Sequence, residues 1–146
     1  MKRLILFFSL CLCLSAAWAQ TADERVGHML NTSDWFALER EYPALKDSVQ
    51  APFLRVMAES LAAVYFGRDD EAVSLIDSLV RNYQDYIGFD NTKNMVLVQA
   101  QTEARRQRYA KAAEIVGNFV NQVKAQTDQA DLRQPEAALH LYGIRS

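Results

Sequence analysis

Apolar residues recur along this chain at the three-, seven- and ten-residue spacings that place side chains on one face of a helix. The pattern occurs in three segments, which can be aligned with one another. The step from the first segment to the second is 34 residues, and the step from the second to the third is 40. The aligned positions are Trp35, Leu38, Tyr42 and Leu45, then Asp69, Ala72, Ile76 and Leu79, then Tyr109, Ala112, Val116 and Phe119.

This pattern predicts three antiparallel helical hairpins, in which the aligned residues belong to the second helix of each hairpin. Gly67 falls at the bend of the second hairpin, and Pro52 occupies a first-turn position, where proline is tolerated. The hydroxyls of Thr32 and Ser33 suit the start of a helix in the first hairpin. No strand-like alternation of useful length occurs. The predicted helix pairs are 22–31 with 34–45, 52–66 with 69–83, and 91–107 with 109–125.

Two segments interrupt or follow this pattern. The six extra residues of the second step are expected in a linker over residues 82–91. A polar stretch at 126–134 leads through Pro135 to a short apolar tail at 137–144, for which the sequence offers no obvious partner. We therefore expect a helical domain over residues 20–125, and a polar linker with a helical tail over residues 126–146.

A single hairpin of this kind is too small to be stable alone, because a few buried side chains cannot offset the conformational entropy lost by about thirty ordered residues. Each hairpin must bury its other face against a neighbour. The expected fold is therefore all-α, with about three hairpins stacked as in a solenoid.

The repeated segments resemble tetratricopeptide repeats over residues 21–125. The resemblance depends on the 34-residue step, the small residue at the helix bend, and the starts of the second helices, "DDEA" (69–72) and "YAKA" (109–112). The Trp and Gly-Tyr signals usual in the first helix of that family are missing, and no repeat ends in the expected proline. An irregular helical bundle with coincidental spacing is the alternative.

A narrower resemblance concerns the N-terminus together with residues 21–48 and 82–101. These segments are similar to the helical N-terminal region of secreted bacterial proteins that continue into a retropepsin-like aspartic protease domain. Such a domain carries Asp-Thr-Gly or Asp-Ser-Gly, and neither triplet occurs here. The resemblance therefore implies an accessory or pro-segment region whose catalytic domain is absent from this chain.

The first nineteen residues predict a secretory signal peptide. Met1-Lys2-Arg3 gives a positive start, the apolar run that follows is too short to span a bilayer comfortably, and a small-x-small site ends at Ala19. We expect cleavage after Ala19 and export to the periplasm or the extracellular space. The alternative is a buried N-terminal helix, although no charged residue interrupts the run as it would on an amphipathic helix.

Export would also remove both cysteines, because Cys11 and Cys13 lie inside the predicted signal peptide. The mature chain would have no thiol, which excludes disulfides, thiolate zinc sites and cysteine nucleophiles. Without residues 1–19, which hold two basic residues and no acidic ones, 14 basic residues face 18 acidic ones, a formal charge of −4. Nucleic acid is a poor partner for such a surface, and no second apolar run is long enough to span a membrane.

Catalytic and metal-binding motifs are missing from the sequence. His28 and His140 are the only histidines and belong to no His-x-x-x-His pair, and there is neither a Gly-x-Ser-x-Gly elbow nor a Gly-rich phosphate loop. Glu59 and Glu103 could face each other across a groove, but a working carboxylate pair also needs a cleft. The acidic run 69–71 begins a helix, where negative charge is favoured. We predict no enzyme activity, no metal and no cofactor.

The densest basic cluster contains Arg105, Arg106, Arg108 and Lys111. It is either a solvated turn between helices or a docking site for an acidic peptide or carboxylate, which arginine binds through paired hydrogen bonds.

Two further sets of residues are candidates for partner contact. Gln99 and Glu103 lie on the conspicuously polar helix that precedes the basic cluster, where they suit contact with a ligand on the inner face. Tyr86 and Phe89 belong to the richest aromatic stretch outside the signal peptide. These rings either fill the space around the six-residue insertion or anchor a partner.

Taken together, these features predict an exported, non-catalytic helical-repeat module that binds a protein or peptide through its inner face. The alternatives are an accessory region of a secreted aspartic protease and a self-associating structural unit.

Overall fold

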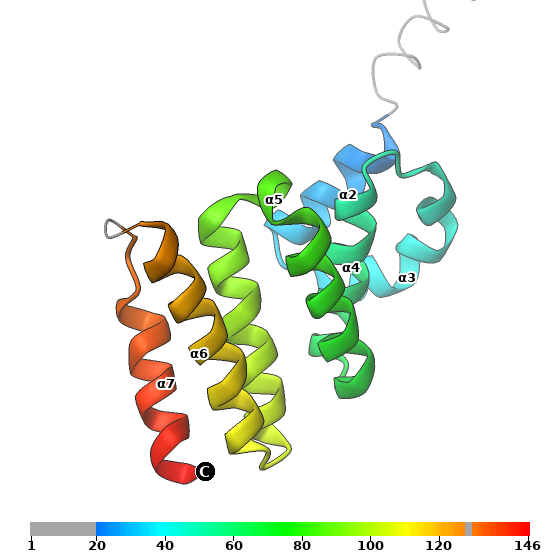
Figure 1. Ribbon diagram of the computed structural model, residues 1–146. Coiled ribbons are helices and arrows are strands. Elements are labelled where there is room, and N and C mark those ends of the chain that lie inside the picture. Colours follow the sequence, from blue (N-terminus) through cyan, green and yellow to red (C-terminus); the bar gives the residue numbers. More distant parts are fainter. Residues whose placement is uncertain (1–19, 128–129) are drawn as a thin grey trace, which may run out of the picture. The chain divides into compact units, whose positions relative to one another are not determined.

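The computed structural model describes residues 20–127 and 130–146, so the predicted signal peptide lies outside the described residues. All regular elements in the described part are helices, which confirms the all-α prediction (Figure 1). They are α2 (Ala22–Asn31), α3 (Trp35–Leu45), the 3-10 helix η1 (Lys46–Ser48), α4 (Pro52–Tyr65), α5 (Asp69–Arg105), α6 (Tyr109–Gln126) and α7 (Arg133–Arg145).

The chain forms two compact units, the first ending at Gln50 and the second covering Ala51–Ser146. In the first unit α2 packs against α3, and both contribute buried side chains, among them Val26 and Leu38. A capping box starts α2, because Thr21 accepts a hydrogen bond from the Glu24 amide and the Glu24 carboxylate accepts one from the Thr21 amide.

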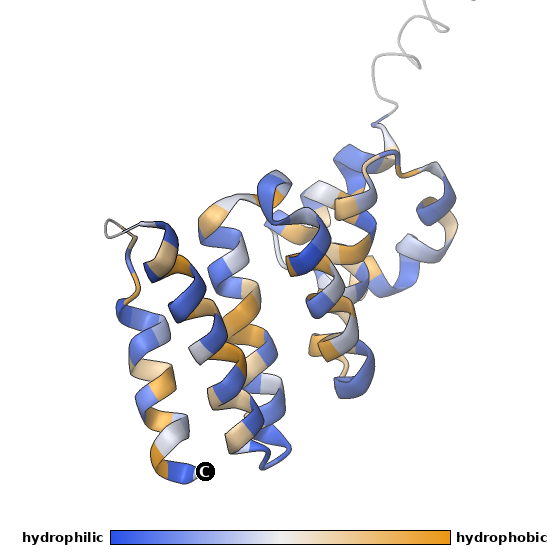
Figure 2. Cartoon of the chain, viewed as in Figure 1, coloured by the Kyte–Doolittle hydropathy of each residue, from blue (hydrophilic) through white to orange (hydrophobic). Residues whose placement is uncertain are grey.

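In the second unit each helix packs against the next one along the chain, α4 against α5, α5 against α6, and α6 against α7. Every helix of this unit carries both hydrophobic and hydrophilic residues, as Figure 2 shows. One apolar cluster, around Ile76 and Leu79, lies between α4 and α5, and a second, around Val116 and Phe119, lies among α5, α6 and α7. Val80 of α5 contacts both clusters and makes the core continuous.

The aligned residues of the predicted hairpins are in the core. Of the twelve positions, eight are buried, and Trp35, Leu45, Asp69 and Tyr109 are half-buried. The eight buried residues are Leu38, Tyr42, Ala72, Ile76, Leu79, Ala112, Val116 and Phe119.

One turn connects the two helices of each hairpin, and the three turns share the same backbone geometry. Ser33, Gly67 and Gln107 each adopt a positive φ, at 55°, 72° and 60°. At each turn the next amide donates to the carbonyl five residues earlier, as in a Schellman motif, over 2.9, 2.8 and 3.0 Å. These turn residues are separated by 34 and 40 residues, the same steps as the aligned helices. The residue that caps α3 is Asp34, whose carboxylate accepts from the Ala37 amide, and not the predicted Thr32 or Ser33.

The predicted linker over residues 82–91 is wrong. Helix α5 continues through this region and only Gly88, at φ 76° and ψ 169°, leaves the helical conformation. A sharp bend therefore divides α5 into a first segment (residues 69–87) and a second segment (residues 89–105). The side chains of Asn91 and Thr92 donate to the carbonyls of Ile87 and Gly88, so the bend does not leave these groups unsatisfied.

The C-terminal tail does have a partner. It forms α7, which begins earlier than predicted, at Arg133, and packs along α6. Leu139 and Tyr142 contact the apolar cluster around Phe119, and Pro135 is fully buried.

Candidate functional site: a groove between α5 and α6

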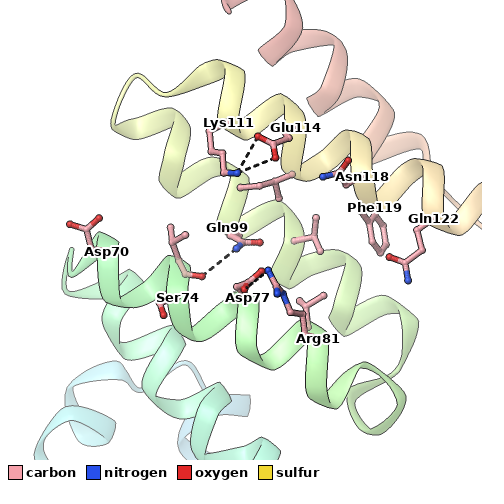
Figure 3. A pocket seen from close by; sticks show the side chains of 14 residues that line it. Asp70, Ser74, Asp77, Arg81, Gln99, Lys111, Glu114, Asn118, Phe119 and Gln122 are labelled. Carbon is pink, nitrogen blue, oxygen red and sulfur yellow. Dashed lines mark hydrogen bonds and ion pairs between the residues drawn. The ribbon is translucent and has the colours of Figure 1, made fainter.

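A groove of about 530 Å³ lies between the first segment of α5 and α6, with the second segment of α5 beneath it (Figure 3). All of its lining residues belong to the second unit. Val96 and Gln99 line it from the second segment of α5. Each wall is formed by side chains that are spaced about one helical turn apart along a single helix. The polar wall residues are Asp70, Ser74, Asp77 and Arg81 of α5, and Lys111, Glu114, Asn118 and Gln122 of α6.

Helical periodicity explains how these polar rows arise. On α5 the row has spacings of four, three and four residues, and on α6 the spacings are three, four and four. Such spacings keep side chains on one side of a helix. The adjacent positions of both helices carry the apolar residues that form the core.

The groove has an apolar floor. Val96 and Phe119 are buried, and Val73, Val80 and Ile115 are half-buried. A ligand lying in the groove would cover apolar surface that is now partly exposed to water, which favours binding.

The charged residues along the rim form ion pairs. Asp77 pairs with Arg81 at 3.0 Å on α5, and Glu114 pairs with Lys111 at 3.1 Å on α6. Asp70 pairs with Arg106 at 2.6 Å at one end of the groove. The formal charges of these six side chains cancel.

Gln99 is held in place at the centre of the groove. It is buried, and its Nε2 donates to the carbonyl of Val73 over 3.2 Å, which joins the two segments of α5. Its side-chain oxygen is directed toward the groove (Figure 3). This amide can therefore accept a hydrogen bond from a ligand.

The predicted basic cluster is neutralised within the structure. Arg105 pairs with Asp69 at 2.7 Å and Arg108 with Glu103 at 3.5 Å, and Arg106 and Lys111 form the rim pairs already described. Each of the four cations thus already has a carboxylate partner, which lowers the positive charge that the cluster offers to an acidic ligand. Of the four residues, only Lys111 lines the groove.

The predicted aromatic residues lie on either side of the bend at Gly88. Phe89 stacks on Phe119, a groove residue, with ring centroids 6.0 Å apart. Tyr86 is 74% exposed and stacks on Phe53 of α4 at 6.2 Å. Phe89 thus supports one end of the groove, whereas Tyr86 is not among the residues that line it.

Glu103 does not line the groove. It is only 4% exposed and occupies the turn position that Met29 and Ala63 hold in the other two hairpins, both of which are buried as well. The site therefore brings together two of the predicted residues, Gln99 and Lys111, with Phe89 behind it.

A smaller pocket of about 220 Å³ lies in the first unit, beside Glu41. Hydrogen bonds from Arg40 and from Arg25, at 3.0 and 2.6 Å, hold the pKa of the Glu41 carboxyl below its ordinary value. In the second unit the side chain and backbone of Arg133 do the same for the pKa of Asp131. Both are exposed surface pairs, which explains the shifts without a binding role.

The sequence analysis missed most of the polar groove residues. Ser74, Asp77 and Arg81 do share a helical spacing, but the same spacing describes any solvated helix face. Only the packing of α6 beside α5 distinguishes a groove wall from ordinary surface.

Comparison of this chain with protein-family models, with curated proteins and with solved structures found no match. Within the described residues, no helix has the length and apolar character needed to cross a membrane. The same part of the chain contains no group of three or more His, Cys, Asp or Glu side chains that could hold a metal ion.

Proposed function

We propose that this protein is an exported helical-repeat scaffold, related in design to tetratricopeptide arrays, that binds a peptide segment of a protein partner in the groove between α5 and α6. The observation that carries the proposal is the groove itself, with its apolar floor, its paired rim charges and its central amide. The export part of the proposal depends on the predicted signal peptide.

The repeated turns support the scaffold part of the proposal. The same positive-φ residue and the same hydrogen bond recur after 34 and 40 residues. Helical repeats present their binding surfaces on helices of neighbouring units, and the walls of this groove likewise come from the second helices of successive hairpins. The proposed surface thus differs from the inner face that the sequence favours.

The chemistry of the groove supports binding as its role. Its polar groups are ion-paired acids and bases, neutral amides and the hydroxyl of Ser74, and its floor is aliphatic and aromatic. Such a combination orients a ligand and excludes water.

Photo-cross-linking in the exporting cell tests this proposal. A photoreactive amino acid is placed at Asn118, which lines the groove, or at the matched control Asn121, which is exposed on the same helix outside it. We expect a cross-linked product of higher mass from position 118 and not from position 121, with a mature N-terminus at Gln20. Equal products from both positions, or none from position 118, would contradict the proposal.

A further inference from the structure

The groove also indicates which kind of segment it accepts, an inference that rests on the proposed function. We propose that it binds an extended, uncharged peptide segment of about five residues, and that the side-chain amides of Gln99, Asn118 and Gln122 hold the peptide backbone.

The dimensions of the groove favour an extended chain over a helix. Its wall on α5 runs from Asp70 to Arg81, about 17 Å at 1.5 Å per residue. Dividing the volume of about 530 Å³ by this length gives a mean cross-section of about 30 Å². A helix with its side chains is about 10–12 Å across, so only one of its faces could enter the groove. An extended chain advances about 3.3 Å per residue, so the groove holds about five residues.

The charges of the rim favour an uncharged segment. Each acidic side chain that lines the groove already has a basic partner, so a charged ligand that takes a partner from one of these pairs leaves another charge unpaired and gains no net ion pair. An exposed ion pair contributes little, so exchanging it for a pair with the ligand adds little affinity. Placing an unpaired charge over the floor formed by Val96 and Phe119 costs free energy, because the ligand loses water without gaining a partner.

The amides match the spacing of a peptide backbone. Asn118 and Gln122 are one turn apart on α6, about 6 Å along the helix axis. Alternate residues of an extended chain are about 6.6–6.8 Å apart and present their backbone groups in the same direction. A side-chain amide both donates and accepts, as a peptide group does. Gln99 contributes the acceptor oxygen of its side-chain amide from below, while one of its two N–H donors is bonded to the Val73 carbonyl.

The same extended geometry predicts the side chains of the ligand. Successive side chains point to opposite faces, so every second residue is directed to the floor. Since that floor consists of Val73, Val96, Ile115 and their neighbours, we expect aliphatic residues at alternate positions, with uncharged polar residues between them.

Selection from a phage library of random nonapeptides on the full chain tests the inference, and the selected peptides are then assayed on the groove-filling variant Asn118→Trp. The expected consensus is about five uncharged residues, alternately aliphatic and polar. The consensus peptide is then synthesised with a fluorophore, both unmodified and with N-methyl groups on its central residues, and binding is measured by fluorescence anisotropy. N-methylation removes the backbone donors and should weaken binding about tenfold or more.

Variants of the protein complete the test. Asn118→Leu and Gln122→Leu should each weaken binding about 2- to 10-fold, while the matched control Asn121→Leu should leave it unchanged. If binding survives in Asn118→Trp, or if no peptide is enriched, the groove is not a peptide site and the proposed function fails. If Asn118→Trp abolishes binding but the consensus is charged or helical, or N-methylation has no effect, the groove function stands and this inference is overturned.

Discussion

At the residue scale, the second and third hairpins each bury a small side chain near the start of their second helix. Ala72 and Ala112 hold equivalent positions in the second and third hairpins, and both are fully buried. The backbone amide at each position donates to the carbonyl of the residue that precedes the helix, Arg68 or Arg108. A larger side chain at either position has to displace the facing helix.

We predict that Ala112→Leu lowers the free energy of unfolding by about 1–3 kcal/mol, because added methylenes overpack a filled core. Urea denaturation followed by circular dichroism measures the change. The control is Ala110→Leu, an exposed position on the same helix, where the expected change is within about 0.5 kcal/mol. Equal unfolding midpoints for the two variants would show that α6 can move away without cost.

Residue spacing predicts well which side chains are buried, but it predicts poorly which charged side chains form ion pairs. Ile76 and Val116 could be assigned to the core from the sequence because the period of a helix determines which side chains share a face. The partner of Arg105 could not be predicted in this way. Asp69 is 36 residues away and meets it only because the first and second segments of α5 fold back beside each other. Charged groups that are isolated in the sequence can therefore be neutralised in the fold.

At the element scale, α5 contains two helices joined through one residue. The bend replaces the expected ten-residue linker because the residues on both sides of Gly88 are compatible with helix, and one glycine supplies the change of direction. Sequence patterns locate such a bend poorly, since a single glycine within a helix is often tolerated. The packing of α7 could not be predicted from the sequence either, because the contacts of Leu139 depend on where the chain turns after α6.

We predict that Gly88→Ala destabilises the protein by about 1–3 kcal/mol, because φ 76° with ψ 169° is essentially restricted to glycine. A Cβ at this position would meet no atom within 4 Å, so the effect comes from the backbone and not from a clash. Thermal or urea unfolding measures it. Gly143→Ala is the matched control, since Gly143 lies inside α7 with open space around it and should be neutral or stabilising by up to about 1 kcal/mol. A neutral Gly88→Ala would mean that the bend relaxes into another geometry.

At the scale of the whole molecule, the chain contains two compact units with separate buried residues. The second unit holds both apolar clusters and all of the groove residues. Its helices pack consecutively from α4 to α7, so no helix within it depends on the first unit for its nearest neighbour along the chain.

We therefore predict that a fragment of residues 51–146 folds independently. It should show a helical circular dichroism spectrum and a single cooperative unfolding transition in urea. Its free energy of unfolding should depend less steeply on urea concentration than that of the full chain, because less surface is exposed on unfolding. The full chain provides the comparison. A fragment that unfolds without cooperativity would show that the core of the second unit is insufficient without residues 20–50.

The position of Gly88 links ligand binding to stability. The first segment of α5 forms one wall of the groove, the second segment contributes Val96 and Gln99 from the other side of this bend, and α6 supplies the opposite wall. A bound ligand therefore contacts three segments that must separate when the unit unfolds. At a free concentration of a hundred times its dissociation constant, it would raise the free energy of unfolding by about 2.7 kcal/mol. Thermal-shift measurements on a collection of candidate compounds or peptides can consequently reveal an occupant before its natural source is known.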